Sequence, residues 1–151
     1  MLVSTRGRYA LRIILELSNH PRDEYVPLIE ISENQGISLK YAEAIVAFLT
    51  KANLLEGKRG KSGGYKLVKD PSQYTAGEIL ALTEESLAPV SCLNDTPNKC
   101  PKAKTCKTLP LWENMNTLIQ DYLFSVTIDD LNHPKKKKGS RLAGEVFGAS
   151  L

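Results

Sequence analysis

The feature that most constrains the fold is Gly36, which stands between two short amphipathic segments, residues 28–35 and 39–51. A glycine here suits the left-handed residue that closes a helix. Ser38, just before the second segment, is a typical N-cap, because its hydroxyl accepts a hydrogen bond from the first turn. A short helix, a tight turn and a capped helix form the helix-turn-helix pattern of many DNA-binding domains. Helical domains that never touch DNA contain such turns too, so this pattern alone leaves both functions open.

Another amphipathic helix is expected ahead of this pair, over residues 5–18, with Ser4 as its N-cap. Its apolar positions recur at helical spacing: Ala10, Leu11, Ile14, Leu15 and Leu17. Arg6, Arg8 and Arg12 lie elsewhere on its surface. We therefore expect one face of this helix in the core and a basic face outside.

A glycine-rich, basic stretch follows, between two short runs of strand-forming residues at 54–56 and 65–68. Four glycines between these runs permit the positive φ angles of a hairpin tip, from which Lys58, Arg59 and Lys61 project. The lysines can neutralise DNA phosphates, and Arg59 is long enough to enter a minor groove. After a helix-turn-helix, this hairpin indicates the wing of a winged helix. The alternative is a flexible loop that its lysines merely keep hydrated.

Two more helices are expected towards the C-terminus. Thr75 and Glu78 match a capping box, which would open a helix ending near Glu84. A longer helix is predicted over residues 109–125. Beginning within it, five apolar residues follow the 3, 4, 3, 4 spacing of a heptad seam: Trp112, Met115, Ile119, Tyr122 and Val126. Three leucines widen this face: Leu111, Leu118 and Leu123.

An apolar face this broad needs a partner. We expect the same helix of a second copy, because two-fold DNA sites require two-fold proteins. Packing within one chain is the alternative. The seam residues are therefore predicted dimerisation residues.

Three cysteines, Cys92, Cys100 and Cys106, lie in a loop rich in Pro, Asn and Lys. Cysteines usually lie in cores, and this loop cannot form one. The cluster therefore indicates a metal, a metal–sulfur cluster or a disulfide. No apolar run is long enough for a membrane span, and the N-terminus does not resemble a signal peptide, so a cytoplasmic location without membrane contact is expected. In a reducing cytosol, three thiols favour metal ligation or redox chemistry over a structural disulfide.

Enzymatic function is not expected. The chain lacks the Ser-His-Asp order, the HExxH pattern and the phosphate-binding GxxxxGK loop. Its net charge of +3 alone says little about nucleic acid. A helical interaction module without DNA binding stays open as a further class.

The predicted fold is mainly α with a small β-hairpin: a winged helix-turn-helix head plus a long C-terminal dimerisation helix. The expected divisions are a DNA-binding domain over 1–85, a cysteine-containing sensor loop over 86–108, a dimerisation helix and C-terminal segment over 109–132, and a basic, disordered tail over 133–151. The lysine run at 135–138 belongs to that tail.

Several motifs resemble, in order, the Rrf family of bacterial winged-helix transcription regulators, which includes IscR, NsrR and CymR. The similar segments span the chain from Met1 to about Leu131: residues 4–12, 37–45, 59–65, 75–80, the cysteine loop, 111–112 and 127–131. The resemblance implies a homodimeric DNA-binding regulator, expected to be a repressor, on a palindromic double-stranded operator.

The resemblance also implies roles for individual residues. The helix that Ser38 opens would enter the major groove, and the candidate major-groove or phosphate contacts are Ser38, Lys40, Tyr41 and Glu43. Arg59 would read the minor groove, and Arg6 and Arg8 would contact the DNA backbone. Glu43 can accept a hydrogen bond from cytosine N4, or it can merely solvate its helix.

The three cysteines resemble those of the branch of the family that binds iron–sulfur clusters. Cys92, Cys100 and Cys106 would then hold a 2Fe-2S or 4Fe-4S cluster that senses iron–sulfur status, redox state or nitric oxide. IscR-like members place a histidine three residues after the third cysteine, where this chain has Leu109, and NsrR-like members use an acidic residue near the position of Arg8. The fourth ligand is therefore unassigned, and its candidates are Asp95, Glu113, an N-terminal side chain of the partner subunit and a small exogenous molecule.

Other kinds of control stay open beside the iron–sulfur cluster. One is a cluster-free regulator of the same fold, governed by a protein partner as in the CymR-like branch of cysteine metabolism. The others are thiol oxidation and zinc binding. The Cys-x-x-Cys knuckles of structural zinc sites do not occur in this chain.

Overall fold

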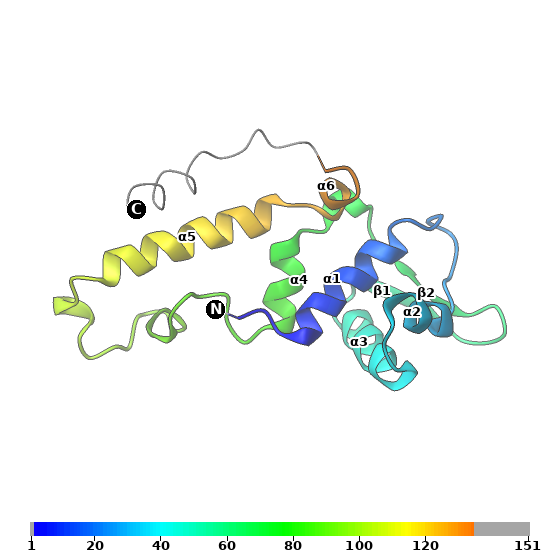
Figure 1. Cartoon of the computed structure of the whole chain (residues 1–151), viewed down its shortest axis with the longest axis horizontal. Coiled ribbons are helices and arrows are strands. Elements are labelled where there is room, and N and C mark those ends of the chain that lie inside the picture. The colour runs from blue at the N-terminus through cyan, green and yellow to red at the C-terminus, as the bar shows by residue number, and fades with distance from the viewer. Residues whose placement is uncertain (1, 135–151) are drawn as a thin grey trace, which may run out of the picture.

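The computed structural model describes residues 2–134, which form a winged-helix head and one long helix that projects from it (Figure 1). The head contains α1 (Thr5–Leu17), α2 (Leu28–Gln35), α3 (Leu39–Lys51), β1 (Leu55–Lys58), β2 (Gly64–Leu67), η1 (Pro71–Gln73), α4 (Ala76–Thr83) and α6 (Ile128–Asn132). The cysteine loop, residues 86–108, carries the single-turn helices η2 (Ser91–Leu93) and η3 (Ala103–Thr105), and leads into α5 (Leu109–Ser125). The predicted fold class is confirmed. The predicted tail lies, from residue 135 on, outside the described residues.

Local capping features set the starts of α1 and α3 and the end of α2, as the sequence predicts. The Gly7 amide donates to Ser4 Oγ at 3.0 Å, and the Tyr41 amide donates to Ser38 Oγ at 3.2 Å. Gly36 has φ 63°, the left-handed conformation that a side chain would disfavour. The tight turn between α2 and α3 therefore depends on this glycine.

The hairpin is an antiparallel pair in which Leu55 lies opposite Leu67 and Lys58 opposite Gly64. The strands lie closer to the tip than predicted, because Tyr65 is fixed by a distant segment: its amide and carbonyl both bond to Val26 at 2.9 Å. Gly64 makes this approach possible, since a Cβ there would lie 2.2 Å from the Val26 carbonyl oxygen. The wing is thus attached to the loop that precedes α2.

The predicted capping box at α4 is only half formed. The Glu78 amide donates to Thr75 Oγ1 at 3.0 Å, as expected. The Glu78 carboxylate instead accepts a hydrogen bond from Lys69 Nζ at 3.0 Å. An ion pair to the end of the hairpin thus takes the place of the return bond that the motif predicts.

The core is built around α1, whose Ile13 and Ile14 are fully buried. Ile45 of α3, Ile79 of α4 and Ile128 of α6 lie in the same apolar cluster. The chain therefore returns to the head after α5. Backbone bonds complete this return, from the Ile128 amide to the Tyr74 carbonyl at 3.0 Å and from the Ala76 amide to the Val126 carbonyl at 2.9 Å.

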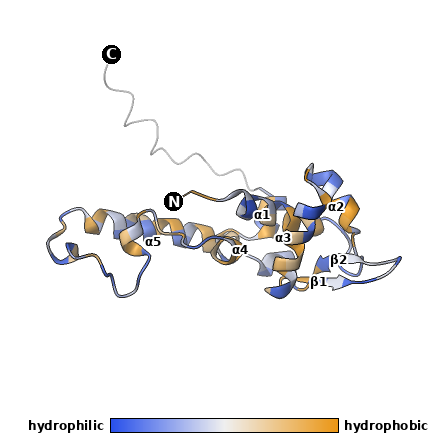
Figure 2. Cartoon of the chain, turned by 90° about the horizontal axis from the view of Figure 1, so that it is seen from below, coloured by the Kyte–Doolittle hydropathy of each residue, from blue (hydrophilic) through white to orange (hydrophobic). Residues whose placement is uncertain are grey.

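The long helix α5 buries none of its residues within the described chain. Its C-terminal turn rests on α4, where the ring of Phe124 lies so close to Gly77 that a Cβ on the glycine would come within 2.6 Å of it. Towards its N-terminus it extends away from the head and carries apolar residues along its length (Figure 2). Gly77 therefore sets how closely α5 approaches the head.

Replacing Tyr74 with Phe is expected to lower the free energy of unfolding by about 2 kcal/mol, because three backbone groups lose the hydrogen bonds that this buried hydroxyl makes with them. The Tyr74 hydroxyl donates to the Leu54 carbonyl at 2.7 Å and accepts from the Val68 and Lys69 amides at 2.9 Å. Urea unfolding measures the change. The control is Tyr9→Phe, at a half-buried tyrosine packed edge-on against Tyr41, which should shift stability by less than about 0.5 kcal/mol. Equal effects of the two variants would contradict this role of Tyr74.

Candidate functional site

The outer surface of α3 holds the predicted major-groove residues. Ser38, Lys40 and Glu43 are exposed there. Tyr41 is half-buried and packs edge-on against Tyr9 of α1, with ring centroids 5.9 Å apart. The Ser38 hydroxyl serves as the helix cap, and Lys40 and Glu43 present their charges to solvent.

The hairpin tip presents Lys58, Arg59 and Lys61 to solvent. Across residues 2–134, neither Arg59 nor Lys61 takes part in a salt bridge, so both charges are available to an outside anion. A hollow of about 450 Å³ separates this hairpin from the C-terminal half of α3, and Lys51 and Tyr65 line it with Lys58 and Arg59. Basic side chains thus surround the groove between α3 and the wing.

Two residues near the wing were missed by sequence reasoning. Tyr25 lies at the base of the wing, with Lys66 Nζ 4.8 Å and Lys58 Nζ 5.5 Å from its ring centroid. Its hydroxyl donates to Glu56, and this bond is the main cause that raises the pKa of Tyr25 above its usual value. Lys51 is the other. In the sequence, Tyr25 stands out as an aromatic residue in a polar loop, and Lys51 as a basic residue in the last turn of α3. These two signals could have identified them.

Arg6 and Arg8 have different surroundings. Arg6 Nη2 donates to the Thr83 carbonyl at 2.6 Å, and its guanidinium carbon lies 5.3 Å from the ring centroid of Phe48 in α3. Arg8 is exposed and donates to Thr5 Oγ1 at 3.2 Å. Arg6 therefore joins three elements of the head, while Arg8 faces solvent.

All three cysteines are free and partly exposed, on a loop at the opposite end of the molecule from the wing (Figure 1). Thr108 Oγ1 lies 3.3 Å from Cys106 Sγ, and this hydrogen bond is the main cause that lowers the pKa of the Cys106 thiol. In the part of the chain that the structure describes, no three Cys, His, Asp or Glu side chains converge on a common point. In this conformation the loop does not bring its three sulfurs together.

The chemistry of the cysteine loop nevertheless fits a thiolate-bound metal group. Thiolates are soft donors, and a lowered thiol pKa favours the ligating form. Four exposed lysines, which sequence reasoning did not use, would offset the negative charge of such a group: Lys99, Lys102, Lys104 and Lys107. Asp95, a candidate fourth ligand, pairs with Lys99 Nζ at 3.1 Å, and Leu109 offers no donor atom.

The predicted seam of α5 is half-buried at Trp112, Met115, Ile119 and Val126, and Tyr122 is 54% exposed. The most exposed apolar residues of α5 are Leu118, at 71%, and Leu111, at 57%, which neighbour the seam. These two lie seven residues apart and so on one side of the helix. Leu111 and Leu118, the leucine face of α5, are thus the most exposed part of the apolar face that the sequence predicts, and the dimerisation seam stays a prediction. No helix within residues 2–134 combines the length and the hydropathy that a bilayer crossing requires.

Comparison with known proteins places this geometry in a family. Residues 3–134 match Rrf2, described as an iron-dependent transcriptional regulator. The chain is 35% identical over 131 residues to the HTH-type transcriptional regulator IscR of Vibrio campbellii, covering 87% of this chain and 77% of that protein. It is 34% identical over 136 residues to IscR of Pectobacterium atrosepticum, covering 90% and 82%. These relatives are transcription regulators and not enzymes.

Solved structures agree with this assignment. CymR, the global cysteine regulator of B. subtilis, is 31% identical, with a TM-score of 0.74 and coverage of 89% of this chain and 98% of that one. IscR of T. potens is 30% identical, with a TM-score of 0.69 and coverage of 93% of each chain. The chain belongs to the Rrf2 family of winged-helix, DNA-binding transcription regulators.

Proposed function

We propose that this regulator is a homodimer, acting in the cytoplasm as a repressor, whose affinity for a palindromic operator depends on an iron–sulfur cluster. Cys92, Cys100 and Cys106 would hold the cluster. The observation that carries this proposal is a set of three free, partly exposed thiols on one lysine-rich loop, in a chain similar to IscR. The cluster type, 2Fe-2S or 4Fe-4S, and the fourth ligand stay unassigned.

On the DNA side, α3 would enter the major groove, with Lys40 and Glu43 at base edges or phosphates. Ser38 and Tyr41 would contribute at the start of that helix, through backbone or hydroxyl contacts to phosphate. Arg59 would enter the minor groove. This assignment is supported by the exposure of the charged side chains and by the groove between α3 and the wing.

The remaining basic residues would contact the DNA backbone. Lys58 and Lys61 flank Arg59 at the hairpin tip and would neutralise phosphates there. Arg8 is exposed on α1 and suits a phosphate contact. Arg6 is a weaker candidate for DNA, because its guanidinium already bonds the Thr83 carbonyl and covers Phe48.

A change at the thiols of the cysteine loop would affect the elements attached to both ends of the loop. It leaves the head directly after Thr83 and Glu84, and it enters α5 at Leu109. Whether the cysteines hold a cluster would depend on the supply of iron and on oxidants. Drawing the three cysteines together to hold it would reshape a loop whose regular structure is only two single-turn helices.

A second candidate is a cluster-free regulator of the same fold, controlled by a protein partner or by thiol oxidation. It is favoured by the similarity to CymR, by Leu109 in place of a ligating residue and by the lowered pKa of Cys106. Such a protein would be colourless, with thiols that are free or oxidised. The spectrum of oxygen-free protein therefore separates the two candidates.

Protein purified without oxygen is expected to absorb visible light and to contain iron and acid-labile sulfide. Cys100→Ala should lose all three signals, because two thiolates cannot replace the missing ligand. Ser91→Ala, at an exposed residue next to Cys92 in the same loop, is the control and should keep them. Colourless, iron-free wild-type protein with normal helical content would contradict the cluster and favour the second candidate.

Lys61→Ala is expected to weaken DNA binding and to reduce the slope of log affinity against log salt by about one, as loss of one phosphate contact requires. The probe is the duplex that the wild type selects from a randomised pool. Lys104→Ala removes the same charge at the opposite end of the molecule and should leave the slope unchanged. Equal slopes for wild type and Lys61→Ala would remove the wing from the interface.

Leu118→Glu is expected to weaken dimerisation by about 100-fold, because a buried, uncompensated carboxylate costs roughly 3 kcal/mol. Analytical ultracentrifugation across a dilution series measures this change. Thr117→Glu introduces the same charge at the next residue, on a different side of α5, and should affect dimerisation much less. A monomeric wild type, or equal effects of the two variants, would contradict pairing through the leucine face.

A further inference from the structure

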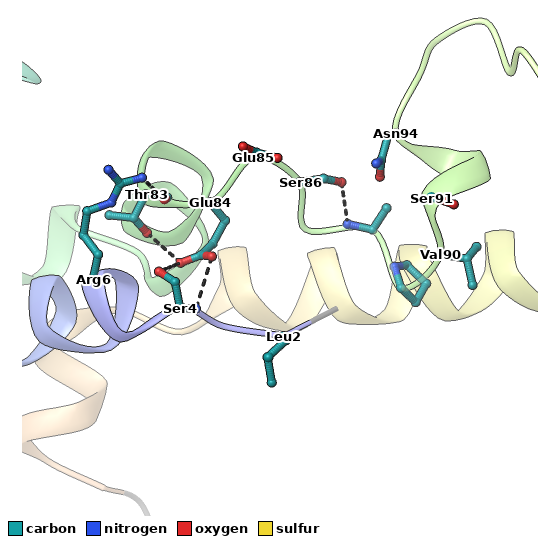
Figure 3. Close-up of a pocket in the computed structure, with 12 residues that line it drawn as sticks. Leu2, Ser4, Arg6, Thr83, Glu84, Glu85, Ser86, Val90, Ser91 and Asn94 are labelled. Carbon is teal, nitrogen blue, oxygen red and sulfur yellow. Dashed lines mark hydrogen bonds between the residues drawn. The ribbon is translucent and has the colours of Figure 1, made fainter.

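The first residue after α4, Glu84, is bound to the N-terminus of α1. Its carboxylate accepts hydrogen bonds from Ser4 Oγ at 2.7 Å, from the Ser4 amide at 3.2 Å and from Thr83 Oγ1 at 3.3 Å (Figure 3). The Ser4 hydroxyl also caps α1 by accepting from the Gly7 amide. Ser4 thus donates to the end of α4 and accepts from the start of α1, so one hydroxyl links the two elements.

Gly7 is required for this contact. A Cβ at position 7 would lie 2.2 Å from Glu84 Oε1 and 3.0 Å from Thr83 Oγ1. The carboxylate occupies the space that a side chain would fill. It also lies beside the first turn of α1, where the helix dipole favours a negative charge. Geometry and charge both hold Glu84 against this turn.

Arg6 extends the contact to the recognition helix. Its guanidinium bonds the Thr83 carbonyl at 2.6 Å and covers the ring of Phe48 at 5.3 Å. Thr83 precedes Glu84, and Phe48 lies on the inner side of α3, where it packs against the core. The start of α1 therefore touches both the base of the cysteine loop and the helix predicted to enter the major groove.

A hollow borders the segment after Glu84. A hollow of about 630 Å³ lies between the N-terminal residues and the first part of the cysteine loop, lined by Leu2, Ser4, Arg6, Ser86, Ser91 and Asn94 among others (Figure 3). Glu84 is thus the last residue tightly bound to α1 before the chain enters the loop. Leu87, three residues further on, is buried, so the chain is held on both sides of Glu85 and Ser86.

We propose that Glu84 is a positioning residue for DNA binding. It fixes the N-terminal turn of α1, and through Arg6 the helix α3, relative to the base of the cysteine loop. A change in the loop reaches the DNA-reading surface through the Glu84–Ser4 contact. This role in regulation rests on the proposed function, whereas the positioning of α1 does not.

The test compares three full-length variants: Glu84→Ala, Glu84→Gln, which keeps one acceptor oxygen, and Glu85→Ala, which removes the same charge at the next, exposed residue. Amide hydrogen exchange at Gly7 and Arg8 reports the order of the first turn of α1. Affinity for the selected duplex, measured with and without the cluster, gives the coupling ratio. Helical content by circular dichroism verifies folding of each variant.

Glu84→Ala is expected to speed exchange at Gly7 about tenfold, as local opening becomes easier, and to reduce the coupling ratio at least about threefold. Glu84→Gln should lie between Glu84→Ala and the wild type, and Glu85→Ala should match the wild type. Wild-type exchange in Glu84→Ala, or equal losses in Glu84→Ala and Glu85→Ala, would overturn the proposal.

The failure of the proposed function gives a different result. A wild type with equal affinity in both states would end the cluster mechanism, and its coupling ratio would be one before any substitution. The exchange data would still decide whether Glu84 holds α1. Faster exchange together with weaker binding in Glu84→Ala would support positioning, and unchanged binding would overturn it.

Discussion

The packing of α1 into the centre of the head is the interaction on which the rest of the structure depends. This helix contacts α2, α3, α4, α6 and β2, and its Ile13 and Ile14 are fully buried among them. One element, α1, therefore positions α3 and the wing. It also positions both ends of the excursion, the segment of residues 84–127 that contains the cysteine loop and α5. Because Ile128 returns to the same core, the cysteine loop and α5 are anchored at both ends.

Local rules predicted the helices well. Ser4, Gly36 and Ser38 act through bonds and backbone angles within a few residues, so the bounds of α1, α2 and α3 follow from the sequence within one residue. The strands were shifted because Val26, almost forty positions away, fixes Tyr65. Glu78 could not be assigned to Lys69, nor Glu84 to Ser4, because those partners come together only in the folded chain. The contact of Phe124 with Gly77, which orients α5 on the head, likewise forms only in the folded chain.

The candidate site divides in the same way. The sequence itself shows a basic, glycine-rich hairpin tip and three cysteines in a loop that cannot form a core. The charged and sulfur-containing residues of the site could therefore be named. The surroundings of these residues could not be predicted, because the contacts of Tyr25 with Lys58 and of Phe48 with Arg6 form only in the folded chain. Arg6 shows the consequence, since an exposed basic residue on a predicted DNA face is engaged by Thr83 and Phe48 of the same chain. The distance between the thiols is a property of the loop conformation, and sequence spacing did not determine it.

The wing and the cysteine loop lie at opposite ends of the folded molecule (Figure 1). Regulation therefore requires that a change in the loop alter DNA binding at the wing and α3. The most direct measurement is a titration of one selected duplex with a single oxygen-free preparation, before and after iron and sulfide are removed by a chelator, at fixed salt. A difference in affinity of at least about fivefold is predicted, the lower end of typical coupling between two sites. Identical binding curves, from protein that was loaded and then verifiably stripped, would contradict control of DNA binding by the thiolate-bound group.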